Sequence, residues 1–223
     1  MAFAEAGALY WSKMALSVWS YPTRIVFGPG SAAQTGAEAK NFVSGKSLLL
    51  VSDRGVVEAG LTKGVEASLE ANALQSRIFA DLSTNPTEAE VEAGVEAYRA
   101  AGAEGIVAVG GGAALDVAKL ILVRANVPDR TWEELDDSLG GDRFIPKQLP
   151  PVIAIPTTAG TGSEIGRAAV LTVASTGSKT VIFAPSMLPR VAILDPELTV
   201  SLPPGPTAAT GFDALTHCLE AYL

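Results

Sequence analysis

The feature that most constrains the fold is a series of short, continuous apolar runs separated by longer amphipathic stretches. Such runs differ from the apolar–polar alternation of strands that have one face in water, so they predict strands buried on both faces. Buried strands alternating with helices are typical of a parallel sheet. The predicted strands are Arg24–Phe27, Ser47–Val51, Gln75–Phe79, 105–109, 152–155, 166–174, Lys179–Phe183 and Val191–Leu194. The sequence therefore predicts a doubly wound α/β domain with a mostly parallel sheet.

The stretches between the strands predict the helices and the domain organisation. Helices are expected over 31–40, from Val57 to about Leu74, from just after Asn85 to Ala101, from the triple glycine to about Arg124, and over 132–139. Three prolines and one glycine predict a linker at 201–206, and a last helix is expected over 207–223. We thus expect an N-terminal extension (1–20), an α/β domain (21–205) and the opening helix of a truncated, all-helical domain (206–223).

The composition excludes several classes of function. The sequence holds one histidine and one cysteine, which excludes a disulfide framework and any metal site rich in His or Cys from this chain alone. Its formal net charge of −8 argues against nucleic acid as a partner. No apolar run reaches the ~20 residues of a membrane helix, and the first residues lack the basic flank of a signal peptide. We therefore expect no membrane association and a cytoplasmic location.

A glycine-rich segment between a predicted strand and a predicted helix indicates phosphate binding. It runs over 110–119 with the sequence GGGAALDVAK, and its three glycines let backbone N–H groups approach a pyrophosphate at a helix N-terminus. The alternative is a tight turn that packs the helix on the sheet. Asp53, just beyond the second strand, can accept hydrogen bonds from a ribose 2′-OH and repel a 2′-phosphate, which favours NAD over NADP. The alternative for Asp53 is a helix cap.

Two further motifs carry polar chemistry. The segment 156–164 (PTTAGTGSE) holds four hydroxyl side chains and two glycines, which suits a cradle for sugar hydroxyls and phosphates, although an ordinary polar turn is possible. Asp213 and His217 stand four residues apart, so on a helix a carboxylate and an imidazole can converge on one divalent cation. A surface pair, or a buried histidine with satisfied hydrogen bonds, is the alternative.

These motifs, in this order, resemble the iron-containing (group III) alcohol dehydrogenase family, which shares its fold with dehydroquinate synthase and glycerol dehydrogenase. The resemblance runs from about Tyr21 to Leu223 and also includes 21–28 (YPTRIVFG), 194–199 (LDPELT) and 211–222 (GFDALTHCLEAY). It implies a Rossmann-like dinucleotide-binding domain, a helical domain, and an active site in the cleft between them. It departs from the family at Ala113, where a serine is usual, and at Gly166, where many relatives carry threonine.

The resemblance also implies a set of site residues. Asp53 would read the adenosine ribose, Asn85 would line the cofactor groove, and the glycines would hold the pyrophosphate. The implied cofactor contacts are Asp53, Asn85, Gly110, Gly111, Gly112, Asp116, Thr157, Thr158, Thr161, Lys179 and Thr199. Asp213 and His217 match the family's first two metal ligands. Its next two are histidines further along, which this sequence does not hold, so we expect the chain to be a fragment.

The function that follows is hydride transfer between NAD(H) and a small alcohol or aldehyde, with a divalent metal polarising the substrate oxygen. The metal would be Fe²⁺, with Zn²⁺ as the alternative. A homo-oligomer, at least a dimer, is expected of the full-length protein. The alternatives are an inactive NAD-binding fragment or module, or a relative such as a glycerol dehydrogenase, a maleylacetate reductase or a hydroxyacid–oxoacid transhydrogenase.

Overall fold

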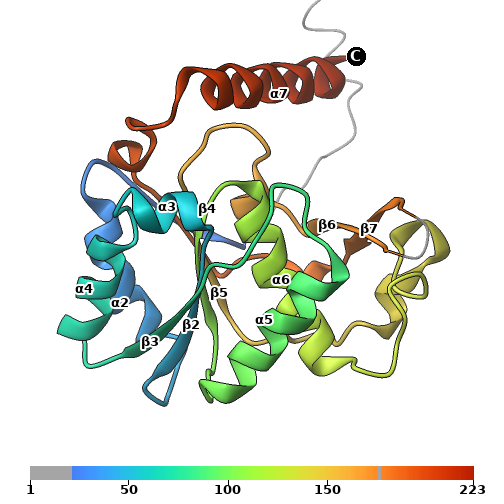
Figure 1. Cartoon of the computed structure of the whole chain (residues 1–223), viewed down its shortest axis with the longest axis horizontal. Coiled ribbons are helices and arrows are strands. Elements are labelled where there is room, and N and C mark those ends of the chain that lie inside the picture. The colour runs from blue at the N-terminus through green and yellow to red at the C-terminus, as the bar shows by residue number, and fades with distance from the viewer. Residues whose placement is uncertain (1–21, 175–176) are drawn as a thin grey trace, which may run out of the picture.

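Six parallel strands form the central sheet of the computed structural model, which describes residues 22–174 and 177–223. The predicted N-terminal extension lies outside these described residues. The strand order is β1 (Arg24–Phe27), β8 (Val191–Leu194), β5 (Val152–Pro156), β4 (Ile106–Gly110), β2 (Ser47–Val51) and β3 (Gln75–Phe79) (Figure 1). All neighbouring strands pair in parallel. This confirms the predicted α/β class and the parallel sheet.

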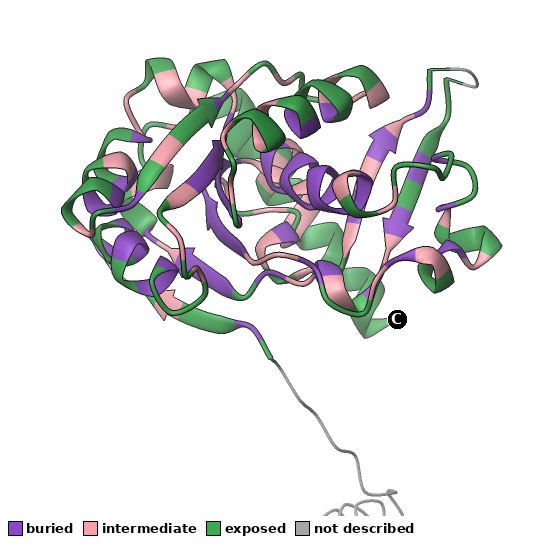
Figure 2. Cartoon of the chain, turned by 90° about the horizontal axis from the view of Figure 1, so that it is seen from below, coloured by how far each residue is buried: buried purple, intermediate pink, exposed green. Residues whose placement is uncertain are grey.

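Helices cover both faces of the sheet because successive side chains of each strand point to opposite sides. In β2, Leu49 and Val51 enter one core, together with α5 (Glu88–Ala100) and α6 (Gly112–Asn126). Leu48 and Leu50 enter the other core, with α2 (Thr35–Ala39) and α4 (Lys63–Ala71). Figure 2 shows this buried interior along the strands. The continuous apolar runs of the sequence therefore reflect two cores that share one sheet.

The strand order reverses beside β2, and this places the site. The chain leaves β2 outward to β3, then returns through α5 to β4 on the other side of β2. In open α/β sheets, ligands bind at the carboxyl ends of the strands at such a reversal. A separate antiparallel pair consists of β6 (Ala168–Thr172) and β7 (Lys179–Phe183), and β6 packs against α6. Together with α5 and the central strands, it buries most of that helix. The carboxyl edge beside β2 and β4 is therefore the place to look for a ligand site.

Most predicted elements are present, with shifts of one or two residues at their ends, but three predicted helices change character. The region 31–40 holds a 3-10 turn, η1 (Ser31–Gln34), followed by α2. The single helix expected from Val57 onward is two helices, α3 (Arg54–Glu58) and α4, which are separated at Gly60. The φ angle of Gly60 is 75°, a left-handed conformation that cannot continue a right-handed helix.

The helix predicted over 132–139 is wrong. Thr131 and Glu134 bond each other's backbone N–H groups, as at a helix start, but Asp136 leaves the helical conformation (φ −59°, ψ 131°) and forms a bridge to Ile182. The Asp136 carboxylate accepts from the N–H of Ser138. What forms is η2 (Asp137–Leu139), followed by η3 (Gly141–Phe144). The predicted linker at 201–206 is also wrong from Pro204 on, where α7 (Pro204–Tyr222) begins. Proline fits a first helical turn, whose N–H groups need no helical partner.

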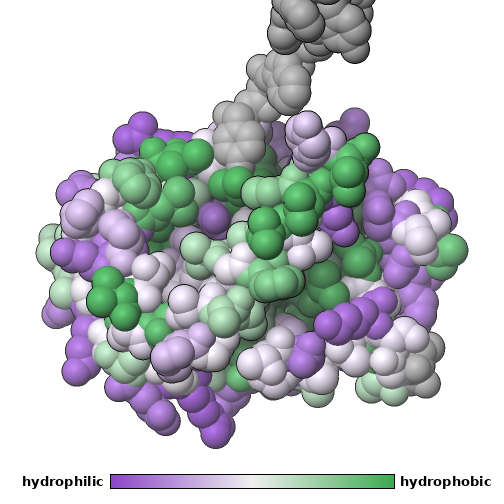
Figure 3. Space-filling model, turned by 90° about the horizontal axis from the view of Figure 1, so that it is seen from above, coloured by the Kyte–Doolittle hydropathy of each residue, from purple (hydrophilic) through white to green (hydrophobic). Residues whose placement is uncertain are grey.

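The helix α7 lies across the carboxyl side of the sheet, outside the two cores (Figure 1). None of its residues is buried, and its large apolar side chains are exposed: Phe212 is 72% exposed and Leu219 is 52% exposed. Figure 3 looks onto this side and shows hydrophobic surface across it, with hydrophilic side chains around the rim. Within the described residues, no helix combines the length and the apolar character that a membrane crossing requires.

Candidate functional site

Asp53 lies just beyond the carboxyl end of β2. It caps a helix, which is the alternative role considered for it, and it also faces the glycine loop. It is the N-cap of α3, and its Oδ1 accepts from the N–H of Val56 at 2.9 Å. Its Oδ2 lies toward Gly110, since a Cβ built on that glycine would stand 3.3 Å from it. Asp53 therefore caps a helix with one oxygen and presents the other beside the glycine loop.

The glycine loop joins β4 to α6 and depends on the absence of side chains. Gly110 has a φ of 155°, and a Cβ there would come within 2.8 Å of the Ala114 Cβ. Gly111 is the N-cap of α6, and Gly112 is its first residue. A Cβ on Gly112 would stand 2.9 Å from Thr161 Cγ2, which leaves no room for one. The N-terminus of this 15-residue helix therefore has backbone N–H groups approachable by an anion.

The loop that follows β5 packs directly on the glycine loop. The N–H of Thr157 donates to the carbonyl of Gly110 at 3.0 Å. Thr158 stands 3.6 Å from the Cβ position of Gly111, in ordinary contact. With Thr161 against Gly112, three threonines line the glycine turn. The structure thus brings together seven of the predicted residues: Asp53, Gly110, Gly111, Gly112, Thr157, Thr158 and Thr161.

A buried cluster that the sequence did not single out fastens this threonine loop to α6. The side chain of Lys119 is fully buried, and its Nζ donates to the carbonyl and the hydroxyl of Ser163, both at 2.7 Å, and to the carbonyl of Ala168 at 2.9 Å. Asp116 accepts from the Ser163 hydroxyl at 2.5 Å and from the N–H of Val170 at 3.1 Å. Asp116, predicted as a cofactor contact, therefore has both oxygens engaged in holding the loop.

Burial governs the charges of this cluster. It lowers the pKa of Lys119 to about 8, against the opposing effects of Asp116 and Glu164. It also raises the pKa of the Asp116 carboxyl, against the opposing effects of Lys119, the Ser163 hydroxyl and the N–H of Val170. A signal for the cluster existed in the sequence: Asp116 and Lys119 are three residues apart in the first twelve residues of α6, which are otherwise apolar. Their partners lie more than 40 residues away along the chain, so their role could not be read from that spacing.

Asn85 and Lys179 are brought near each other at a second part of this edge. The N–H of Thr172 donates to the carbonyl of Pro86 at 2.7 Å, and Thr172 pairs with Lys179 across β6 and β7. Both predicted residues are exposed.

The last predicted cofactor contact, Thr199, ends η6 (Pro196–Thr199), where its hydroxyl donates to the carbonyl of Pro196 at 2.8 Å. Asp195, which precedes this turn, is buried and accepts from the N–H groups of Gly30, Ala32 and Glu197 at 3.0–3.1 Å. It therefore ties the turn after β8 to the turn after β1. Asp195 belongs to the motif 194–199, whose sequence alone indicates no role for it.

Asp213 and His217 share a face of α7, as predicted from their spacing. The His217 Nε2 lies 3.5 Å from the Asp213 Oδ1, and both side chains are about half exposed, at 56% and 41%. Thr210, one turn before Asp213, packs on Gly160 of the threonine loop, where a Cβ would come within 2.9 Å of the Thr210 Cβ. Residues 210, 213 and 217 fall on one side of a helix, so the donor pair faces the threonine loop.

The pair offers one carboxylate and one imidazole, a donor set suited to Fe²⁺ or Zn²⁺. Among residues 22–174 and 177–223, no group of three or more His, Cys, Asp or Glu side chains could hold a metal ion. Two such side chains do not fill the coordination sphere of a tightly held Fe²⁺ or Zn²⁺ ion.

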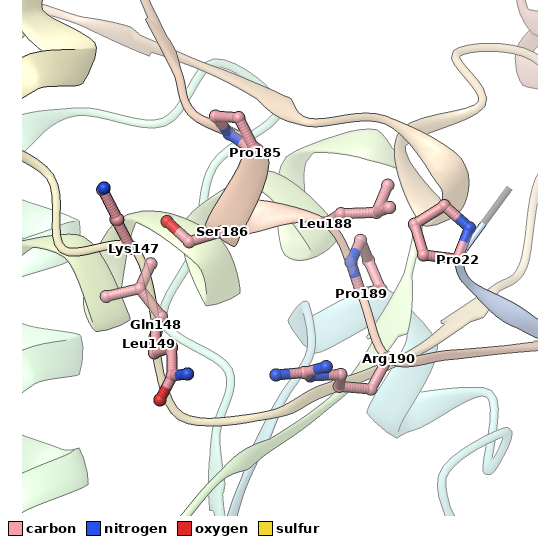
Figure 4. Close-up of a pocket in the computed structure, with 9 residues that line it drawn as sticks. All are labelled: Pro22, Lys147, Gln148, Leu149, Pro185, Ser186, Leu188, Pro189 and Arg190. Atoms are coloured by element: carbon pink, nitrogen blue, oxygen red, sulfur yellow. The ribbon is translucent and has the colours of Figure 1, made fainter. Parts of the chain in front are cut away.

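A surface pocket lies at the other end of the sheet and contains no predicted site residue. It is lined by residues that precede β1, β5 and β8, among them Pro22, Leu149 and Arg190 (Figure 4). Since these segments lead into the amino ends of parallel strands, the pocket is remote from the carboxyl edge. It belongs to the side of the fold that α/β proteins do not use for the cofactor.

Several known proteins are similar to this chain in sequence. A family model described as "Iron-containing alcohol dehydrogenase" matches residues 22–196. A 4-hydroxybutyrate dehydrogenase from Cupriavidus necator is 42% identical over 177 residues, covering 78% of this chain and 45% of the relative. The chain spans about half the length of the curated relatives it matches.

Solved structures match in the same proportion. The crystal structure of a 1,3-propanediol oxidoreductase superposes with a TM-score of 0.84 at 35% identity, covering 92% of this chain and 53% of that one. A sulfoacetaldehyde reductase from Bifidobacterium kashiwanohense, solved in complex with NAD⁺, gives a TM-score of 0.77 at 35% identity, covering 90% and 51%.

Proposed function

The chain belongs to the iron-containing alcohol dehydrogenase family, and from that premise we propose that it forms the NAD(H)-binding half of a metal-dependent dehydrogenase. The reaction is hydride transfer between NAD(H) and a small alcohol or aldehyde. The observation that supports this best is the meeting of three features at one sheet edge. These are the glycine turn, the threonine loop packed on it, and the face of α7 that bears Asp213 and His217.

In this proposal each part of the edge has a role toward the dinucleotide. The N-terminus of α6 and the glycine backbone hold the pyrophosphate, because unpaired N–H groups and the helix dipole favour an anion. Asp53 accepts from the adenosine ribose, and its charge disfavours a 2′-phosphate. Thr158 and Thr161 supply hydroxyl groups along the turn. Asn85, Lys179 and Thr199 extend the groove, while Asp116 acts indirectly by fixing the loop.

Asp213 and His217 are proposed as two ligands of a divalent metal, with Fe²⁺ preferred and Zn²⁺ the alternative. Such an ion, when bound, supplies Lewis-acid polarisation of the substrate oxygen. The chain's own contribution is to hold a carboxylate and an imidazole on one helix face, directed toward the threonine loop. His217 is the only histidine of the sequence, so we propose that any further histidine ligands come from residues outside this chain.

The domain boundaries are proposed as α/β residues 21–205 followed by the first element of a helical, metal-binding part. A cytoplasmic location and a homo-oligomer of the full-length protein remain proposals, the former supported by the single cysteine, which fits a reducing compartment. The substrate is proposed as a small alcohol or aldehyde.

NADH binding by the purified chain tests the cofactor role. We expect NADH to bind weakly, and Gly112→Ala to weaken binding roughly tenfold, a cost of about 1.4 kcal/mol. The added Cβ would meet Thr161 and shift the threonine loop from the glycine turn. The measurement is NADH fluorescence titration, and the matched control is Gly64→Ala, a helix glycine with open space at its Cβ position. Equal NADH affinity in the two variants would contradict the assignment.

A second candidate function, a binding module without turnover, is favoured by the two-ligand donor set. In that case the 223-residue chain binds NADH and oxidises no alcohol, even with added Fe²⁺. Alcohol-dependent NADH formation by this chain would contradict the module and support a complete dehydrogenase. Three related activities remain as alternatives: glycerol dehydrogenase, maleylacetate reductase and hydroxyacid–oxoacid transhydrogenase. Assays of the full-length protein with glycerol, with maleylacetate, and with paired hydroxyacid and oxoacid substrates distinguish them.

A further inference from the structure

The position after Asp53 holds a basic side chain that a purely NAD-selective site does not need. Arg54 is the first residue of α3, so it stands directly beside the carboxylate proposed to read the ribose. An arginine next to that position is the feature that accommodates the 2′-phosphate of NADP in dinucleotide-binding folds. On sequence alone, Asp53 and Arg54 therefore favour opposite cofactors.

The structure shows what Arg54 does instead. Its Nε and Nη2 both donate to Asp81 Oδ1, at 3.0 and 2.6 Å. Asp81 follows β3, and β2 pairs with β3 so that Val51 lies opposite Phe79. The two parallel strands thus end side by side, and the residues beyond them meet at the carboxyl edge. Sequence distance hides this pair, since 27 residues separate the two partners.

The charges around the ribose position decide the outcome. Asp53 and Asp81 each carry a negative charge, and Arg54 carries a positive charge. Asp81 forms an ion pair with Arg54 and so neutralises its charge. Glu58, one turn along α3, also acts on the guanidinium: Asp81 first, then Glu58, raise the pKa of Arg54 above its usual range. A 2′-phosphate, which carries close to two negative charges at neutral pH, would meet Asp53 with no guanidinium directed toward it.

We infer that Asp81 is a specificity-determining residue, which enforces the preference for NAD(H) by holding Arg54 away from the ribose position. The inference rests on the proposed function, because it requires a dinucleotide bound at this edge. It assigns Asp81 a positioning role, exercised through Arg54, and no contact with the reacting atoms. Because both side chains are well exposed, at 75% and 70%, the effect is modest and depends on ionic strength.

The test measures the dissociation constants of NADH and NADPH by fluorescence titration at low and high salt. Asp81→Asn keeps the shape and removes the charge, so we expect NADPH to bind roughly 5-fold more tightly with NADH little changed, the scale of one exposed ion pair. Asp81→Glu restores the carboxylate and is expected to return the wild-type ratio. The double variant Asp81→Asn with Arg54→Ala is expected to lose the gain.

The matched control is Glu58→Gln, which removes one nearby negative charge and leaves the Arg54–Asp81 bond in place. An equal NADPH gain in Glu58→Gln and Asp81→Asn, or a gain that persists without Arg54, would overturn the inference and leave a simple charge effect. An unchanged NADPH to NADH ratio in Asp81→Asn overturns it too, while NADH binding by the wild-type chain upholds the cofactor site. A wild-type chain that binds no NADH overturns the proposed function itself.

Discussion

At the scale of single residues, the threonine loop depends on one buried ammonium group. Lys119 satisfies three oxygen atoms, and two of these belong to Ser163, so one side chain fixes the loop where it turns away from the glycines. Without Lys119 those acceptors would stay buried and unpaired, next to a carboxyl group that lacks its counter-charge. The cost of removing one partner from such a group exceeds the net value of the contact itself.

We expect Lys119→Met to lower the free energy of unfolding by about 3 kcal/mol, the usual scale for removing one partner of a buried ion pair. Urea denaturation followed by circular dichroism measures this change. Lys63→Met, on the exposed side of α4, is the control and is expected to be nearly neutral. A cost for Lys119→Met no larger than that of the control would show that the cluster does not hold the loop.

The stability cost of Lys119→Met is expected to depend on pH. The folded pKa of Lys119, about 8, lies below the ordinary value of 10.5, so the unfolded chain binds more protons between these values. Stability contributed by this group therefore rises with pH from about 8 to 10.5. The cost of Lys119→Met is expected to be larger at pH 9.5 than at pH 7.5. An equal or smaller cost at the higher pH would mean that Lys119 stays charged in the folded protein.

At the scale of elements, the strands were predictable and several helices were not. In β2 the apolar run is buried on both faces, and both β2 and the largely exposed edge strand β3 were predicted with their observed bounds. Helix bounds depend on local conformation, as where the non-helical Asp136 caps the N-terminus of η2 and separates it from the preceding turn. The prolines of 201–206 predict a linker, although a first helical turn accepts proline. Long-range pairs such as Asp195 with Gly30 had no local signal at all.

The two helices that flank the threonine loop differ in how firmly they are held. Ten residues of α6 are buried, whereas α7 has none. We expect the amide hydrogens of α7 to exchange with solvent far faster than those of α6, because opening α7 exposes little apolar surface. Hydrogen exchange followed by mass spectrometry compares the two helices within one sample. Equal protection of α6 and α7 would indicate that α7 is covered in solution.

At the scale of the whole molecule, the described fold has one closed side and one open side. The sheet and its two cores are complete, while the carboxyl side carries the apolar stripe of α7: Phe212, Leu215, Leu219 and Tyr222. Large exposed apolar patches promote association between molecules. The same edge carries the residues proposed to bind the cofactor and the metal. Many contacts at this edge join segments that are far apart in the chain, so the sequence predicts only part of its structure.

We expect the double variant Leu215→Glu with Leu219→Glu to reduce self-association of the chain and leave NADH affinity unchanged. The two leucines lie on the apolar stripe, away from the glycine turn. Light scattering across a concentration series measures association. Ala67→Glu with Ala71→Glu adds the same charge on the exposed side of α4 and serves as the control. Equal effects of the two pairs would attribute the change to net charge and not to the stripe.

The contact of Thr210 with Gly160 has a consequence for how two ligands would influence each other. The helix that bears the donor pair stands on the loop that lines the glycine turn, so a shift of that loop moves both sites. Thermodynamic linkage then makes the influence mutual: by whatever factor a bound dinucleotide changes the affinity for an ion at α7, the ion changes the affinity for the dinucleotide by the same factor.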